Sequence, residues 1–152
     1  MSDAAERVMR EKKGGDTAVD GLIAGILAGL GMVVYLIFVG LLSGIPAAVM
    51  LGRFDPGLDG RWLSGMLAHL AVSGVYGVIF ALLFSVVVRL QGPLQRFGWL
   101  IGLVYGLLLL ALARGVLLPM AGSALLEIAT VHWVIAHAVY GLLVGFEVGQ
   151  KR

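Results

Sequence analysis

Apolar residues dominate four long stretches of the chain, which follow a polar segment at residues 1–19. The stretches cover residues 21–43, 62–88, 98–119 and 125–148. Each is long enough to cross the ~30 Å hydrocarbon core of a bilayer, which takes about 20 helical residues. None alternates apolar and polar positions, as the strands of a membrane β-barrel do. Because backbone groups in lipid must be hydrogen-bonded internally, the pattern predicts an all-α integral membrane protein with four transmembrane helices.

The connections between these stretches predict how the helices are arranged. They cover residues 44–61, 89–97 and 120–124. The first contains Pro46 and the run Asp55-Pro56-Gly57-Leu58-Asp59-Gly60, which has the residues of a turn and lacks the ligand spacing of a calcium loop. Short connections make successive helices antiparallel, so we expect an up-down-up-down bundle over residues 20–150.

Basic residues gather on one side of this predicted bundle. Eight of the eleven Lys and Arg lie in the N-terminal segment, in or beside residues 89–97, or at the C-terminus. The excess of Lys and Arg marks the cytoplasmic side, so we expect both termini in the cytoplasm, with the protein in the bacterial inner membrane. We also expect Ser2 or Asp3 to cap a short surface helix that ends near Met9.

The two halves of the chain share a pattern. Gly21, Gly25 and Gly29 open the first apolar stretch at the same spacing at which Gly98, Gly102 and Gly106 open the third. The second stretch contains Ser73-Gly-Val-Tyr76-Gly77, and the fourth contains His137-Ala-Val-Tyr140-Gly141. The pattern predicts a tandem repeat of a helical hairpin, in which Ser73 corresponds to His137.

Small residues recur at every fourth position, which places them on one face of each helix. Such stripes let helix backbones approach closely, either within one chain or between subunits. The residues that we assign to helix packing or to docking of a partner are Gly21, Gly25, Gly29, Gly65, Ser73, Gly77, Gly98, Gly102, Gly106, Gly141, Gly145 and Gly149. Because every helix carries such residues, we expect other transmembrane subunits as partners.

Composition supports the membrane prediction. Hydrophobic residues make up 60% of the chain and charged residues 13%, against roughly 25% charged in a soluble domain. The net charge of +2 comes from residues at the ends of the apolar stretches and forms no stripe that would bind nucleic acid. There is no cysteine, so disulfides and thiolate ligands are excluded.

Charged residues are absent from the middle of the predicted spans, which argues against a pump or a proton-coupled transporter. Arg114 and Glu127 lie near the same end of the bundle, on either side of the short connection between the last two helices. We expect them to form an ion pair there.

The three histidines are the clearest polar signal inside the predicted helices: His69, His132 and His137. Facing histidines at matching depth can ligate a b-type haem or a chlorin, and His69 matches His132 in depth. His137, by contrast, belongs to the small-residue stripe, and it lies about 140° around the helix from His132. The alternative is that each imidazole forms a hydrogen bond to a neighbouring helix. We predict no cofactor and no metal, and keep haem, chlorin and quinone as alternatives at these three positions.

Aromatic residues extend this candidate site. Tyr76 shares a helix face with His69, and Tyr140 shares one with His137, so the four side chains could frame a quinone or a lipid head group. Three tryptophans near predicted helix starts fit anchoring at the membrane interface: Trp62, Trp99 and Trp133.

The run His137-Ala-Val-Tyr140-Gly141-Leu-Leu-Val-Gly145 resembles the His-x-x-Tyr-Gly-x-x-x-Gly segments of small prokaryotic four-helix membrane proteins. That resemblance implies a four-helix fold and no activity. Nucleophile-elbow, zinc-protease and phosphate-loop signatures are absent, so we do not expect an enzyme. The leading hypothesis is an accessory or structural subunit of a larger bacterial membrane complex for respiratory or photosynthetic electron transfer. The alternatives are a small haem- or quinone-binding electron carrier and a small transporter or channel.

Overall fold

The computed structural model describes the backbone of residues 3–151 and the side chains of residues 14–151. Its described part is all-helical, and four stretches are long and apolar enough to cross a membrane, as predicted. The elements are α1 (Asp3–Leu42), α2 (Ala47–Gly52), α3 (Trp62–Leu90), η1 (Gly92–Phe97), α4 (Gly98–Leu112), η2 (Ala113–Leu117), α5 (Leu118–Met120), η3 (Ala124–Glu127) and α6 (Thr130–Gln150).

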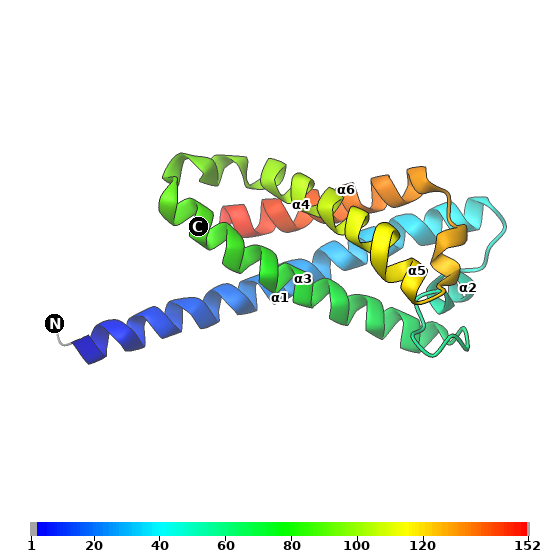
Figure 1. Cartoon of the computed structure of the whole chain (residues 1–152), viewed down its shortest axis with the longest axis horizontal. Helices are drawn as coiled ribbons and strands as arrows, with labels where there is room; N and C mark the ends of the chain where they lie inside the picture. The colour runs from blue at the N-terminus through cyan, green and yellow to red at the C-terminus, as the bar shows by residue number, and fades with distance from the viewer. Residues whose placement is uncertain (1–2, 152) are drawn as a thin grey trace.

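The chain passes back and forth along one long axis, and both termini lie at the same end (Figure 1). We call this the terminal end; the opposite end, which holds α2, α5 and the connections near them, is the loop end. The expected cap at Ser2 or Asp3 lies outside the side chains that the structure describes, and the helix does not end near Met9, because α1 continues without a break from Asp3 to Leu42.

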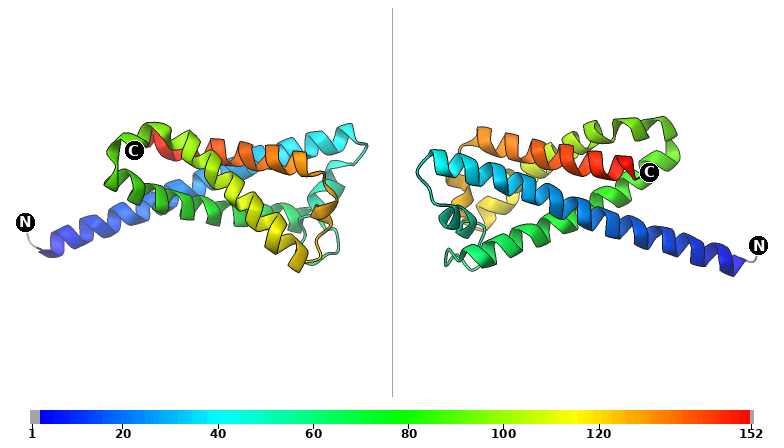
Figure 2. Two further views of the ribbon diagram at one scale, coloured as in Figure 1. Left: turned by 45° about the horizontal axis from the view of Figure 1, so that its top comes forward. Right: turned by 180° about the vertical axis from the view of Figure 1, so that it is seen from behind.

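The four long helices form two hairpins, α1 with α3 and α4 with α6, which are joined by packing of α1 on α6. Figure 2 shows α3 and α4 running from the short turn that connects them to the loop end, and α4 crosses α3 in the left view. The two helices barely touch, because each packs on the other member of its own hairpin. The weak packing between α3 and α4 leaves the space in which the candidate site lies.

Glycines set the close approach within each hairpin. A Cβ atom added to Gly25 would lie 2.8 Å from the Cα atom of Gly77, and one added to Gly102 would lie 2.6 Å from that of Gly145. Neither helix could then keep its place, since real Cβ atoms do not come so near to backbone. The other glycines of the predicted stripes also contact the chain itself: Gly21, Gly29, Gly65, Gly98, Gly106, Gly141 and Gly149.

The glycine contacts align the two hairpins in a register that differs by one helical turn of α6 from the alignment of the sequence motifs. Gly77 meets Gly25 as Gly145 meets Gly102, although the sequence motifs pair Gly77 with Gly141. In this packing register His69 corresponds to His137, and the predicted correspondence of Ser73 with His137 is wrong. The reason is physical: α6 carries glycine at three successive turns, so a local motif does not decide which turn packs.

The buried side chains of the interior come from the first, second and fourth spans, and the largest fully buried ones include Leu36, Phe80, Phe84 and Val144; the third span adds only partly buried side chains such as Tyr105. Many large apolar side chains point outward instead; Phe38 is 59% exposed and Leu108 is 63% exposed. Only 11% of the most apolar window of the third span is buried within the chain. An outward apolar surface of this kind suits a bilayer, in which side chains face hydrocarbon.

The third and fourth spans depart from the predicted helix limits. The predicted helix over 98–119 contains a π-helical turn at Ala113–Leu117, just before Pro119. Proline has no backbone N–H and disturbs the preceding turn, which accounts for the widened segment. The helix predicted from residue 125 begins only at Thr130, after the 3₁₀ turn η3.

Candidate functional site

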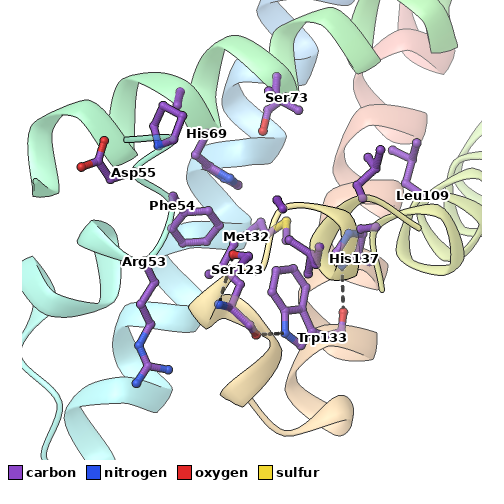
Figure 3. A pocket seen from close by; sticks show the side chains of 18 of the residues that line it. Met32, Arg53, Phe54, Asp55, His69, Ser73, Leu109, Ser123, Trp133 and His137 are labelled. Atoms are coloured by element: carbon purple, nitrogen blue, oxygen red, sulfur yellow. Dashed lines mark hydrogen bonds between the residues drawn. The ribbon is translucent and has the colours of Figure 1, made fainter. Parts of the chain in front are cut away.

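A cavity of about 520 Å³ lies between the hairpins at the loop end. Side chains of α1, α3, α4 to α5, α6 and the 53–58 connection enclose it, and most of its surface is apolar (Figure 3). The residues that line it include Met32, Phe54, Asp55, His69, Val72, Ser73, Tyr76, Ala113, Leu117, Trp133, His137 and Tyr140. Its size is within the range of small-molecule sites, which is ~300–1,000 Å³.

The cavity reaches the outer surface between α3 and the π-helical segment. Val72 and Leu117 both line it, yet they are 54% and 44% exposed. Leu58, which also lines the cavity, is 69% exposed, so the opening at the surface extends to the connection at the loop end. The π-helical turn contributes both Ala113 and Leu117 to the wall.

His69 enters the cavity from α3. Its Nε2 atom lies 3.0 Å from the carbonyl oxygen of Gly29 on α1, and its ring packs 4.7 Å from the ring of Phe54. The residue is 9% exposed. The carbonyl of Gly29 is within reach because α1 and α3 approach closely at this glycine.

His137 enters the same cavity from α6. Its Nδ1 atom lies 3.0 Å from the carbonyl oxygen of Trp133, one turn earlier in the same helix. The indole of Trp133 packs 5.2 Å from the imidazole and donates a hydrogen bond from Nε1 to Leu125 O, at 3.0 Å. Trp133 is 3% exposed, so its predicted place as an interfacial anchor is wrong, whereas Trp62 and Trp99 are 52% and 47% exposed.

His132 lies away from the cavity. Its Nδ1 atom is 3.0 Å from the hydroxyl of Tyr35 on α1. The structure therefore does not bring His69 and His132 together as a ligand pair, because His132 points to a different side of α6. His69 and His132 form hydrogen bonds to α1, as the alternative prediction described, whereas His137 bonds to a carbonyl oxygen within its own helix.

Haem fits this arrangement poorly. Bis-histidine ligation needs a free nitrogen from each imidazole on opposite faces of the ring. His69 uses Nε2 for Gly29 and keeps only Nδ1, the ring nitrogen next to its own main chain, where a bulky macrocycle has least room. The cavity also offers no unpaired cation for the haem carboxylates, since Arg53, its one lysine or arginine, is paired with Glu127 at 3.2 Å.

Two tyrosines close the cavity toward the terminal end. Tyr140 donates a hydrogen bond of 2.7 Å to the carbonyl oxygen of Ser73, and Tyr105 donates one of 2.8 Å to that of Tyr76. Both bonds cross from the second hairpin to α3. The predicted grouping of His69, Tyr76, His137 and Tyr140 around one space is thus present, and Tyr105, which carried no motif, supports it.

Asp55 holds the connection that covers the cavity at the loop end. Its carboxylate accepts hydrogen bonds from the Ser64 hydroxyl at 2.7 Å, from the Arg61 N–H at 3.0 Å and from the Gly57 N–H at 3.3 Å. The bond from Ser64, the bonds from the two backbone amides and the nearby Arg61 guanidinium lower the pKa of Asp55. The run 55–60 is a turn, as predicted, with Leu58 and Gly60 at positive φ.

The predicted ion pair between Arg114 and Glu127 is not formed. The Glu127 carboxylate pairs with Arg53 instead, and Arg114 donates a hydrogen bond of 3.0 Å to the carbonyl oxygen of Ile128. Arg114 lies within the π-helical turn, where the altered helical rotation directs its side chain to the backbone before α6. This bond ties η2 to the start of α6.

No protein-family model, curated protein or solved structure matches the chain. The site must therefore be interpreted from its own chemistry. It combines apolar and aromatic walls, two buried imidazoles and an opening that is lined by exposed apolar side chains. Such a site can hold a small apolar molecule and orient it with a few hydrogen bonds.

Proposed function

We propose that this protein is a non-catalytic membrane protein that binds a small, mostly apolar molecule in the cavity between its hairpins. The observation that supports this most strongly is the cavity itself, about 520 Å³ in volume, with His69 and His137 buried in a largely apolar wall. A space of this kind inside a small bundle costs packing energy, because its lining atoms lose contacts. A bound molecule would restore those contacts.

Access from the bilayer is part of the proposal. The opening lies between Val72 and Leu117, both on surfaces that would face lipid. A molecule that partitions into the membrane reaches such an opening without crossing water. Membrane electron carriers of the quinone class have this property, which brings the proposal close to the second function expected from the sequence.

The test is whether a small molecule co-purifies with the protein. Ala113 lines the cavity, and an Ala113→Phe variant fills part of it; Ala111 is exposed on the lipid side, so Ala111→Phe is the matched control. Protein in mild detergent would be extracted with organic solvent, and the extract analysed by mass spectrometry. We expect one compound in fixed ratio with wild type and Ala111→Phe, and its loss from Ala113→Phe. A compound held equally by all three would contradict the proposal.

A subunit role in a larger bacterial membrane complex is a second proposal. It is supported by the third span, whose most apolar window is only 11% buried within the chain. The glycine stripes no longer support it, because they pack inside the chain. Native size in mild detergent, with mass spectrometry of co-migrating proteins, tests it: a large assembly of fixed stoichiometry is expected, and a monomer would contradict it.

The same proposal places both termini in the cytoplasm, on the basis of the eight Lys and Arg near that side.

A further inference from the structure

The hydrogen bonds of the two cavity histidines determine where each ring carries its proton. A carbonyl oxygen can only accept, so the nitrogen facing it must donate. His69 faces the Gly29 carbonyl with Nε2, and His137 faces the Trp133 carbonyl with Nδ1. In the neutral rings, Nδ1 of His69 and Nε2 of His137 are therefore acceptors.

Neither of these two acceptor nitrogens forms a hydrogen bond with another residue that the structure describes. Among the side chains that the structure describes, no buried nitrogen or oxygen lacks a partner, so both nitrogens must be accessible. Since His69 and His137 are only 9% and 7% exposed and both line the cavity, that access is from the cavity. Figure 3 shows the two side chains entering it from different helices.

We propose that the cavity binds a quinol, an aromatic ring with two hydroxyl groups, which donate to Nδ1 of His69 and Nε2 of His137. This inference rests on the proposed function and names its ligand class. The walls suit a planar ring, because Phe54 and Trp133 already pack on the two imidazoles and Tyr76 and Tyr140 lie on the same cavity. An apolar tail on the quinol would leave through the opening at Val72 and Leu117.

The positions of the imidazole protons on His69 and His137 favour binding of the quinol, the reduced form, over the quinone, the oxidised form. A quinone carries two carbonyl oxygens, which are acceptors and would oppose the acceptor nitrogens of both histidines. The Ser73 hydroxyl can donate or accept, so it does not discriminate between the two forms. A metal ion fits less well than a quinol, because the described part of the chain has no cluster of three or more His, Asp or Glu side chains.

The experiment compares three probes on the wild-type protein in detergent, by calorimetric titration without oxygen. The probes are a short-chain 1,4-benzoquinol, the corresponding quinone, and the dimethyl ether of the quinol, which keeps the ring and lacks both O–H donors. We expect the quinol to bind at least roughly tenfold more tightly than either of the others, since each would leave buried acceptors unpaired. If none of the three binds, the proposed function fails; if all bind alike, only the ligand class is wrong.

Variants locate the two acceptors. His69→Gln keeps an N–H donor near the Nε2 position, which bonds to Gly29, and removes the acceptor at Nδ1. His137→Asn keeps an N–H donor near the Nδ1 position, which bonds to Trp133, and removes the acceptor at Nε2. His69→Gln and His137→Asn should each weaken quinol binding roughly tenfold and leave binding of the dimethyl ether unchanged. His132→Asn, outside the cavity, should change neither. Equal loss for quinol and ether in both cavity variants would overturn the proposal, because it would report a structural defect.

Discussion

Tyr140 on α6 donates a hydrogen bond of 2.7 Å to the carbonyl oxygen of Ser73 on α3, across the end of the cavity nearest the termini. The two residues are far apart in sequence and belong to different hairpins, which otherwise meet mainly through α1 and α6. This bond therefore helps to fix the width of the cavity.

Removing that bond should destabilise the protein. Tyr140→Phe is expected to lower the free energy of unfolding by about 1 kcal/mol, the usual size for one such bond between membrane helices. The Tyr76 hydroxyl has no hydrogen-bond partner among the described residues, so Tyr76→Phe is the control and should have a smaller effect. Thermal unfolding in detergent measures both, and equal midpoints for the two variants would contradict the assigned role of the bond.

Glycine contacts in the two hairpins should have similar importance. A methyl group at Gly25 or Gly102 would meet the backbone of the facing helix, so Gly25→Ala and Gly102→Ala should each cost about 1–3 kcal/mol. Gly115→Ala places its methyl group in open space and should be neutral or stabilising, because alanine favours helix more than glycine does. The fraction of folded protein after heating distinguishes them; a stable Gly102→Ala protein would be inconsistent with this packing.

The Asp55 turn should loosen in acid. The pKa of Asp55 is lowered in the folded protein, so its contribution to stability is present above the ordinary aspartate value of about 4 and is lost as pH falls through the folded value. The protection factors of the 55–61 amides, which compare each observed exchange rate with the intrinsic rate at that pH, should therefore fall in acid in the wild type. Asp55→Asn should have low protection factors at all pH values, and Asp59→Asn, whose side chain is 66% exposed, should behave like the wild type. Wild-type protection factors that do not change with pH would contradict this role.

The proton positions of the histidines can be observed directly. In protein labelled with ¹⁵N-histidine, neutral His69 should be protonated at Nε2 and neutral His137 at Nδ1. Solid-state NMR in lipid distinguishes the two forms by the shifts of the ring nitrogens. His69→Gln and His137→Asn assign the signals, and the same proton position in both rings would contradict the hydrogen bonds described here.

Local pattern was sufficient to predict the four membrane-spanning helices and the hairpin repeat, because apolar length and glycine spacing are properties of the sequence itself. It also placed His137, rather than His132, on the face that carries the glycines of α6. The equal membrane depth of His69 and His132 pointed to His132 as the partner of His69. That prediction failed because the position of a side chain around the helix axis decides which neighbour it meets.

The cavity could not be predicted in the same way. It exists because α3 and α4 pack on different partners and hardly on each other, which depends on contacts between distant segments. Trp133 illustrates the difficulty: its position near a helix start indicated the interface, yet η3 folds back over it and accepts its N–H at Leu125. The π-helical turn before Pro119 likewise directs Arg114 away from Glu127.

The most direct test of the account is whether a small apolar ring reaches Trp133. In a Trp62→Phe/Trp99→Phe protein, Trp133 is the single tryptophan, and it lines the cavity. Titration with a brominated phenol, whose bromine quenches indole fluorescence on contact, should give saturable quenching that Ala113→Phe abolishes and Ala111→Phe preserves. Quenching that rises linearly with the probe and is the same in all three proteins would mean that the probe only dissolves in the surrounding detergent or lipid, and would contradict a binding cavity.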